Sequence, residues 1–343
     1  MVIKGKATSL DIAHMAGVSQ PTVSRALRGS PMVNAETRQR ILDIARQLNY
    51  KVDKNASSLR CQQSGTLALL FFEDPTNDDS LINPFFHSML GSITRACALK
   101  GLDLLVSFQQ LSSDWHADFE DSNKADGIIL LGYGDYHESV ERLQRLVEQG
   151  THFVRWGAAL PGQPGVSIGS DNFQGGFDIS THLLEQGRQR IAFLGHASSH
   201  YPEFEERYRG HVEALAARGL KADASLQHDA ITTEDSGHAA CIALLDSGKD
   251  FDAICAASDL IAIGALRALR ERGLRVPQDI AVTGFDDIPL AASVSPPLTT
   301  VQQDTKQAGQ LLVDKLLSLI AGEPVEGITI PVKLVVRESS LGV

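Results

Sequence analysis

Apolar residues in the first fifty positions recur at the spacing of short helices. Thr8 and Asp11 form a capping box that predicts the start of a first helix, and Gly17 predicts its end. Ser19 is a favourable cap for a second helix, which Gly29 ends. The two helices are joined by a tight turn, AGVS. This pattern predicts a helical domain at the start of the chain.

A third helix completes that domain. Asn34 caps its start. Its apolar residues recur on one face, at Ile41, Ile44, Ala45 and Leu48. A third helix packed behind two short ones predicts a helix-turn-helix domain, whose second helix enters the major groove of DNA led by its N-terminal residues.

The second helix has a polar outer face. Val23, Ala26 and Leu27 supply its apolar side. The opposite side carries Ser19, Gln20, Pro21, Thr22, Ser24 and Arg25. A face with so little to bury predicts contact with something outside the fold.

The rest of the chain repeats one pattern, in which a helix ends at glycine and an apolar strand follows. The pattern occurs in ALKGLDLLVSF, LVEQGTHFVRWG, LLEQGRQRIAFLG and LRERGLRVPQDIAVTGF. Such strands are typical of parallel sheets that are covered on both faces. Alternating strands and helices predict a doubly wound α/β fold in two similar lobes, with a ligand cleft between them at the carboxyl ends of the strands.

Charge divides the chain into a basic head and an acidic body. Residues 1–63 hold ten Lys or Arg and four Asp or Glu, whereas the remainder holds 21 and 38. The head can neutralise phosphates that the body repels, which favours a nucleic-acid partner, although small basic domains are also common. The chain has no apolar run of about 18 residues and no signal-peptide pattern. We expect a cytoplasmic protein whose four scattered cysteines are reduced.

Three segments carry catalytic-looking or metal-ligating residues. GVSIG at 165–169 matches a serine nucleophile elbow, yet PGQPG before it predicts a loop in place of the required strand. GYGD at 132–135 lacks the third glycine of a dinucleotide site. One interpretation of the next segment is a metal site, with ligands among His196, His200, Glu203, Glu205 and Glu206. Pro202 favours a loop at the cleft edge instead. We expect no catalytic site, cofactor or metal.

Residues 8–50 resemble the DNA-binding domain of the LacI-type (lactose-repressor) family of bacterial regulators, through AGVS, TVSR, ETR and LNY. The resemblance implies that Gln20, Pro21 and Arg25 contact bases, and Arg25 suits guanine. Pro21 offers only apolar contact, so Gln20 and Arg25 carry more of the specificity. It also implies phosphate contacts by Thr8, Ser9, Ser19, Thr22, Ser24, Asn34 and Thr37.

The next segment, KVDKNASSLRCQQSG at 51–65, has one large apolar residue in a polar, small composition. A flexible linker would explain most of this. The family resemblance implies a hinge helix that forms on DNA, with Ala56 and Leu59 at the minor groove. Lys51 and Val52 stand where the family usually has a proline, a departure that bears on the stiffness of the hinge.

The resemblance continues through INPFF, ADGIIL, SDNFQGG, ERYRG, ASDLIAIGALRAL, GFDD and PPLTTVQQD. It implies an N-terminal all-α helix-turn-helix DNA-binding domain plus an α/β two-lobed periplasmic-binding-protein-like sensor domain. We expect these over residues 1–52 and 65–343, with the hinge at 53–64. The first lobe would span about 65–162 and 294–324, and the second about 163–293 and 325–343.

The resemblance also places residues at the effector. These are Arg207, Ser258 and Asp286, with Phe72, Asp74 and Gln303 near the same cleft. Ser258 replaces a common asparagine and has a shorter reach. Asp74 belongs to an acidic segment, EDPTNDD, that solvation alone would explain. Whether Glu73 or Asp74 reaches the cleft stays open.

Gly157 stands where several family members carry a ligand-binding aspartate, so polar contact is lost on that wall. In one interpretation, Trp156 and Arg155 replace the lost ligand contact. In the other, Trp156 is a buried strand residue, and Arg155 is paired or extends its charged end to solvent. Asp286, Arg207 and an aromatic ring suit the vicinal hydroxyls of a sugar or small oligosaccharide. Arg207 alone would also suit a carboxylate or phosphate.

These expectations define a regulator, and specifically a repressor, that binds a pseudo-palindromic operator as a homodimer at the nucleoid. The chain ends without a heptad tail, which argues against a zipper-made tetramer. Effector binding would alter the closure of the lobes and thereby the spacing of the hinges, with a coupling of about 1–3 kcal/mol. The alternatives are a sugar-binding protein without a regulatory role and a sugar-processing enzyme.

Overall fold

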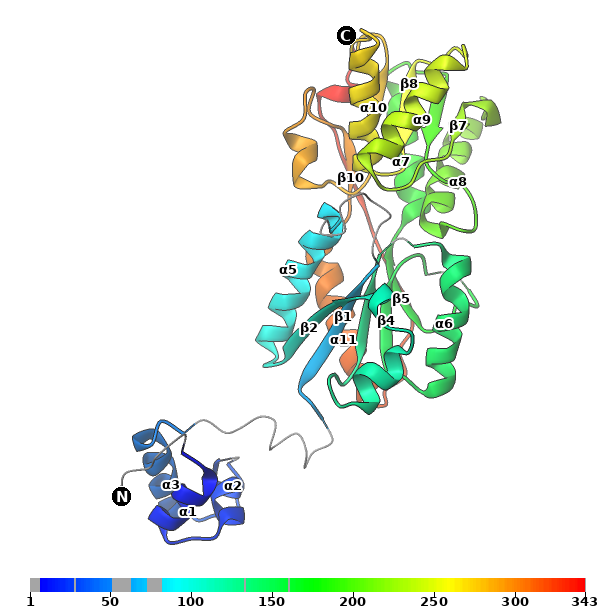
Figure 1. Ribbon diagram of the computed structural model, residues 1–343. Helices are drawn as coiled ribbons and strands as arrows, with labels where there is room; N and C mark the ends of the chain where they lie inside the picture. The colour runs from blue at the N-terminus through cyan, green and yellow to red at the C-terminus, as the bar shows by residue number, and fades with distance from the viewer. Residues whose placement is uncertain are drawn as a thin grey trace. The chain divides into compact units, whose positions relative to one another are not determined.

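The computed structural model describes residues 7–27, 29–50, 63–72, 82–132, 134–159 and 161–342. The chain divides into two compact units, Met1–Ser64 and Gly65–Val343 (Figure 1). The expected hinge residues Ala56 and Leu59 lie outside the described residues, as do Glu73 and Asp74.

The first unit is a bundle of three helices, α1 (Ser9–Ala16), α2 (Gln20–Leu27) and α3 (Ala35–Gln47). The capping box is present, since the Thr8 hydroxyl accepts from Asp11 N and the Asp11 carboxylate accepts from Thr8 N. Gly17 ends α1 with a φ of 64°. The apolar faces meet in a core of Ile12, Ala13, Ala16, Val23, Ala26, Val33, Ile41, Ile44 and Ala45. The helix-turn-helix prediction is confirmed.

The first lobe of the second unit is a six-stranded sheet in which all neighbouring strands are parallel. Its order is β11 (Ile328–Ile330), β5 (Val166–Ser170), β4 (Phe153–Trp156), β3 (Ile128–Leu131), β1 (Thr66–Phe71) and β2 (Asp103–Phe108).

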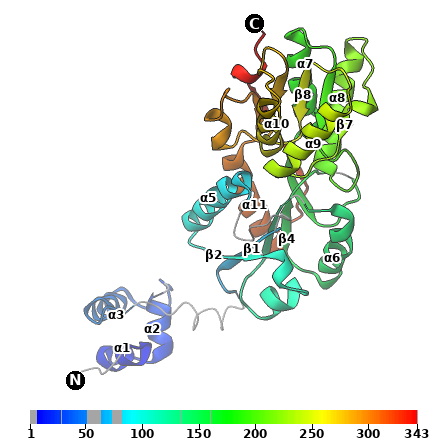
Figure 2. The same ribbon diagram turned by 45° about the horizontal axis from the view of Figure 1, so that its top comes forward.

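Helices cover both faces of this sheet. Leu67, Leu69 and Phe71 of β1 pack in the core with α5 (Pro84–Leu99) and α11 (Thr305–Ile320). The alternate residues Ala68 and Leu70 pack in a separate core with α6 (Tyr136–Gln149). Figures 1 and 2 show α6 on the opposite side of the sheet from α5. The alternation along β1 therefore fixes which helix lies on which face.

The second lobe holds a four-stranded parallel sheet with the order β7 (Gln227–His228), β6 (Ile191–Leu194), β8 (Ala253–Ala256) and β9 (Ala281–Thr283). Its helices are α7 (Asn172–Glu185), α8 (Pro202–Ala217), α9 (Glu234–Asp246) and α10 (Asp259–Glu271). A separate antiparallel pair joins β10 (Thr300–Gln302) to β12 (Lys333–Val335). Short helical turns are η1 (Gln109–Leu111), η2 (His116–Asp121), η3 (Ala224–Leu226), η4 (Pro289–Ala292) and η5 (Glu338–Ser340).

The strand pairing corrects the expected lobe boundaries. The ranges 163–293 and 325–343 would put β5 and β11 in the second lobe, but β5 pairs with β4 and β11 pairs with β5 in the first sheet. After the loop before Val166, the chain returns to the first sheet, and only then does it cross to the second lobe. The chain passes to the second lobe after Ser170, and again after Ile330.

The glycine-capped segments fold as predicted. Gly101, Gly150, Gly187 and Gly273 all have positive φ, and each follows a helix and precedes a strand. The left-handed cap lets each helix end sharply, so that the next strand returns to the sheet.

Buried thiols contribute to the core. Cys97, Cys241 and Cys255 are free, and burial raises the pKa of these thiols to about 11, 12 and 11. Within the described ranges no helix has both the length and the apolar character needed to cross a membrane.

Candidate DNA-binding and effector sites

The outer face of α2 presents the expected base-contacting residues to solvent. Pro21 and Arg25 are exposed. Gln20 is half-buried because its Nε2 donates to Ser9 Oγ at 2.8 Å. This bond links α1 to α2 and orients the Gln20 amide. Val23 and Ala26 are buried on the inner side, which leaves the polar face free for a duplex.

The expected phosphate-contacting residues lie around the helix N-termini. Asn34 caps α3 by accepting from Thr37 N at 2.8 Å, and Thr8 caps α1. Ser19 Oγ lies 2.9 Å from Thr22 Oγ1 at the start of α2. Ser9, Ser24 and Thr37 are half-buried. Helix N-termini attract phosphates through their free N–H groups and dipoles. These contacts stay predictions.

A buried ion pair joins α8 to the segment after β9. Arg207 is 1% exposed, and its Nη1 lies 3.7 Å from Asp286 Oδ1. Arg207 Nε donates to Asn172 Oδ1 at 2.9 Å, and its guanidinium carbon lies 3.8 Å from the Phe285 ring centre. Gln303 Nε2 donates to Asp286 Oδ1 at 2.6 Å. The structure thus brings together three expected effector residues and adds Asn172, which sequence reasoning missed.

Burial controls the protonation of this network. It raises the pKa of Asp286 to about 7, against the opposing effects of the Arg207 charge and the Gln303 hydrogen bond. Asp259 was also missed, and burial and the Asp286 charge raise the pKa of its carboxyl well above 3.8. Asp286 has a φ of 119°, a strained value for a residue with a side chain. Perturbed carboxyls and backbone strain are both typical of functional sites.

Ser258 has a structural role in this lobe. It is fully buried, and its hydroxyl accepts from Ile261 N at 3.3 Å as the N-cap of α10. Such a cap contributes about 1 kcal/mol of helix stability. An effector contact by Ser258 stays a prediction, and it would have to share the hydroxyl with this cap.

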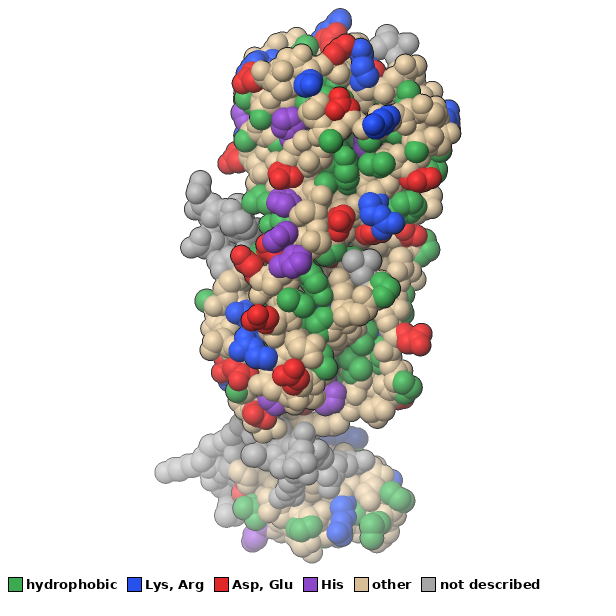
Figure 3. All heavy atoms as spheres, turned by 90° about the vertical axis from the view of Figure 1, so that its right-hand side faces the viewer, with side chains coloured by type: hydrophobic (Ala, Val, Ile, Leu, Met, Phe, Trp, Pro, Cys, Tyr) green, Lys and Arg blue, Asp and Glu red, His purple; other side chains and the backbone are tan. Residues whose placement is uncertain are grey.

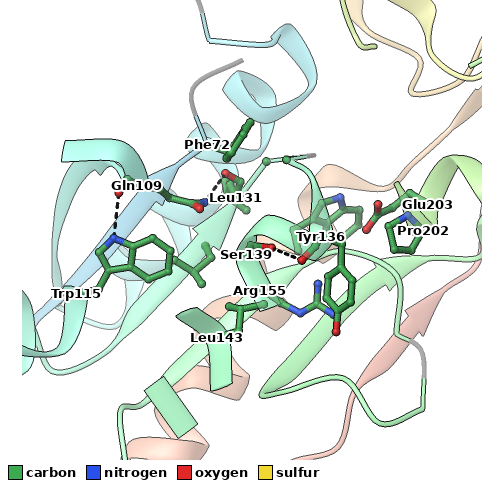
Figure 4. Close-up of a pocket in the computed structure, with 14 residues that line it drawn as sticks. Phe72, Gln109, Trp115, Leu131, Tyr136, Ser139, Leu143, Arg155, Pro202 and Glu203 are labelled. Atoms are coloured by element: carbon green, nitrogen blue, oxygen red, sulfur yellow. Dashed lines mark hydrogen bonds between the residues drawn. The ribbon is translucent and has the colours of Figure 1, made fainter. Parts of the chain in front are cut away.

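A small pocket lies at the carboxyl ends of β1, β3 and β4. Phe72 and Trp156 line it, as do Arg155 and, from the second lobe, Glu203 (Figure 4). Trp156 is only 3% exposed and packs on Phe85 with ring centres 5.9 Å apart. It is therefore both a buried strand residue and part of the pocket wall. The expected effector residues form two groups, because Arg207, Ser258, Asp286 and Gln303 do not line this pocket.

Two charged side chains fill the space beside Gly157. A Cβ on Gly157 would lie 2.8 Å from Glu203 Oε1 and 3.1 Å from Arg155 Nη1. Glu203 Oε1 also accepts from Ala158 N at 2.7 Å, a bond between the lobes. A carboxylate from the second lobe thus lies beside Gly157, the position where the family resemblance implies an aspartate in several relatives. The sequence signal that could have identified Glu203 is its spacing of four residues from Arg207, which places both side chains on one face of α8.

The His200 loop lies at the edge of the lobes, where the sequence predicted a cleft-edge loop. His200 Nδ1 lies 2.7 Å from Asp135 Oδ2, and the ring centres of His137 and His200 are 4.4 Å apart. His137 Nε2 lies 3.0 Å from Ser199 Oγ. Histidine side chains gather on this face (Figure 3). Among the described residues, no group of three or more His, Cys, Asp or Glu is arranged to hold a metal ion.

The other catalytic-looking patterns have structural roles. Ser167 of GVSIG lies within β5 and is buried, so its hydroxyl is not presented at a sharp strand-to-helix turn. Gly132 of GYGD allows Phe72 to approach, since a Cβ there would lie 2.1 Å from the Phe72 Cβ. Among their described residues, neither segment assembles a reactive group.

A helix-turn-helix unit together with a two-lobed α/β unit containing a buried polar network defines the class of ligand-sensing DNA-binding proteins. Residues 8–53 match the model of bacterial regulatory proteins of the lacI family, and residues 180–340 match a periplasmic binding protein-like domain. The HTH-type transcriptional regulator CelR of Thermobifida fusca is 33% identical over 334 residues, 96% of each chain. The chain belongs to the LacI family and is a DNA-binding transcriptional regulator.

Solved structures agree with this assignment. A CelR–cellobiose complex has a TM-score of 0.71 at 32% identity, covering 97% of this chain and 99% of that one. The lac repressor dimer bound to operator and the anti-inducer ONPF has a TM-score of 0.82 at 26% identity, covering 98% and 100%. These proteins are regulators rather than enzymes.

Proposed function

We propose that this chain is a repressor that binds a pseudo-palindromic operator as a homodimer, and that a sugar bound between its lobes changes its operator affinity. The observation that carries the sensor part is the buried Arg207–Asp286 pair with its Gln303 partner. A buried ion pair is costly unless its groups are fully satisfied, so such a pair suits a polar ligand that adds hydrogen bonds to it.

Carbohydrate chemistry matches this network. The Asp286 carboxylate can accept from paired hydroxyls, and Arg207 can donate to a ring or hydroxyl oxygen. The similarity to a CelR–cellobiose complex supports a sugar as the ligand class.

The dimer follows from operator geometry. Two helix-turn-helix heads on half-sites one helical turn apart require two chains related by a two-fold axis. The similarity to a lac repressor dimer on operator supports this arrangement. We place the protein in the cytoplasm at the nucleoid, with no catalytic activity, metal or cofactor.

Switching would act through contacts between the lobes. Glu203 bonds to Ala158 N, and His200 bonds to Asp135 across the same edge. A sugar that favours another closure angle would change these contacts and, through them, the segment that leads to the DNA-binding unit. The coupling in such systems is typically about 1–3 kcal/mol.

The test starts with selection of a preferred duplex from random sequence, followed by fluorescence anisotropy with neutral and acidic sugars. We expect at least one sugar to change operator affinity by about fivefold or more. Arg25→Ala should relax base preference, whereas Lys54→Ala should weaken all duplexes evenly and flatten the salt dependence. No preferred duplex would overturn the operator role, and equal, sequence-independent losses in both variants would overturn the base-reading role of Arg25.

A further inference from the structure

A hydrogen bond between α1 and α2 joins a side chain expected at a phosphate to one expected at a base edge. Gln20, the first residue of α2, donates from Nε2 to Oγ of Ser9, the first residue of α1, at 2.8 Å. Both side chains are half-buried. Among the described residues of this unit, it is the only side-chain hydrogen bond between the two expected sets of DNA-contacting residues.

The bond leaves both side chains with unused hydrogen-bonding groups. A serine hydroxyl has one donor and two acceptor lone pairs, and a glutamine amide has two N–H donors and a carbonyl oxygen. Ser9 therefore keeps its hydroxyl hydrogen, and Gln20 keeps one N–H and its Oε1, with no other partner for them among the described residues. The neighbouring Thr8 differs, because its hydroxyl already donates to Asp11 Oδ2 at 2.7 Å.

A phosphate bound to Ser9 would fix which way round the Gln20 amide lies. The oxygens of a DNA phosphate only accept hydrogen bonds, so the single Ser9 hydrogen goes to the phosphate. Toward Gln20 the Ser9 oxygen can then only accept, which requires Nε2 beside it, as in the structure. The reverse orientation would bring two acceptors, Ser9 Oγ and Gln20 Oε1, together. Docking on the backbone thus locks the amide in the orientation that the protein already has without DNA.

We propose that Ser9 is a positioning residue that couples phosphate binding to base reading, and that it holds Gln20 so that the amide reads adenine and rejects guanine. The remaining N–H and Oε1 of Gln20 are a donor and an acceptor, which match N7 and the N6 amino group of adenine in the major groove. Guanine presents two acceptors there, N7 and O6, so Oε1 would face an acceptor. An amide that is free to turn can direct its N–H groups at guanine instead. The inference rests on the proposed operator binding and names the base that α2 reads at one position.

The test starts from the duplex that the full-length protein selects from random sequence. Gln20→Ala identifies the base pair that Gln20 reads, as the position where this variant no longer distinguishes the four base pairs. The wild type is then titrated by fluorescence anisotropy with duplexes that carry A·T, T·A, G·C or C·G at that position of one half-site. We expect one adenine-containing pair to bind about fivefold or more tightly than both guanine-containing pairs.

A single atom of the base gives a second measurement on the wild type. Replacing that adenine with 7-deazaadenine removes the N7 acceptor of the remaining Gln20 N–H, and it should weaken binding by about fivefold. The same replacement should leave Gln20→Ala unaffected. Both comparisons of bases by the wild type stand even where a variant fails to fold.

Variants of Ser9 separate positioning from simple phosphate contact. Ser9→Ala should reduce the preference for adenine over guanine by about fivefold, because the amide is no longer held. Ser9→Thr should retain the preference, since threonine keeps the hydroxyl. Ser24→Ala is the matched control, because Ser24 is another half-buried serine expected at a phosphate and is not bonded to Gln20. It should weaken binding to all four duplexes by the same factor.

Four results would overturn the inference alone. They are a preference for G·C or C·G at the Gln20 position, 7-deazaadenine that binds as well as adenine, Gln20→Ala that keeps every base preference, and Ser9→Ala that keeps the full preference for adenine. The last result would reduce Ser9 to a phosphate contact. Failure to select any preferred duplex would instead overturn the proposed operator binding itself.

Discussion

The buried carboxyl of Asp286 gives the stability of the sensor unit a defined pH dependence. Burial raises its pKa to about 7 in the folded protein, against an ordinary value of 3.8. Between these values the folded state holds a proton that the unfolded state releases. The free energy of unfolding should therefore fall as pH rises through this window, by about 1.4 kcal/mol per pH unit and about 4 kcal/mol in total.

Asp286→Asn removes the titrating group and keeps its shape. The free energy of unfolding of the wild type minus that of the variant should decrease as pH rises from 5 to 7, and then level off. Titrations shared by both proteins cancel, including that of the buried His211, whose pKa burial lowers to about 4. The titrations of Asp259 and Asp286 are linked, so the measured change in the free energy of unfolding belongs to the pair of carboxyls.

Urea unfolding at several pH values, followed by tryptophan fluorescence, measures this difference for the second unit. Both tryptophans of the chain belong to that unit. Asp250→Asn is the control, because its side chain is 74% exposed, and its difference should stay nearly constant with pH. A flat or rising difference for Asp286→Asn would refute the reasoning, since it would mean that Arg207 keeps Asp286 ionised in the folded protein.

Three further predictions follow from packing and from the lobe edge. Ile12→Ala should destabilise the first unit by about 2–5 kcal/mol and weaken operator binding without changing the tryptophan-monitored unfolding, and unchanged operator affinity would contradict it. Gly210→Ala should lower the urea midpoint of the second unit, because its Cβ would lie 2.1 Å from Phe173 O, and an unchanged midpoint would show that α7 and α8 separate freely. The His200–Asp135 pair should show a coupling of about 0.2–1 kcal/mol in a double-mutant cycle, and additive losses would mean that the bond contributes nothing. Burial opposes ionisation of Asp135, but the hydrogen bonds from His200 and from the His137 and Glu138 backbone N–H groups together hold its pKa below its usual value. This coupling should therefore be present near neutral pH and be lost as acid protonates Asp135.

Local signals predicted most of the fold. Thr8, Asn34 and the glycine caps act within a few residues of the chain, so their effect can be read without knowing the tertiary structure. The assignment of β5 and β11 failed because strand partners are fixed by residues far apart in sequence. Val166 pairs with Val154 across a loop, and Ile328 pairs with Ile168 much later in the chain.

The candidate site was predictable only in part, for a similar reason. Arg207 and Asp286 came from the family resemblance, and the structure places them together. Asn172 and Asp259 act through partners that only the folded chain brings near. HASSHYP was interpreted as a loop because it contains Pro202, yet proline is well tolerated in the first turn of a helix, and α8 begins at that residue.

If DNA and a cleft ligand bind to one coupled system, their effects on each other must be reciprocal. The affinity of an active sugar is measured with and without saturating operator, and operator affinity is measured with and without saturating sugar. We expect the same factor in both directions, about 5-fold to 150-fold. A sugar that binds the full-length protein with an affinity that operator leaves unchanged would contradict it.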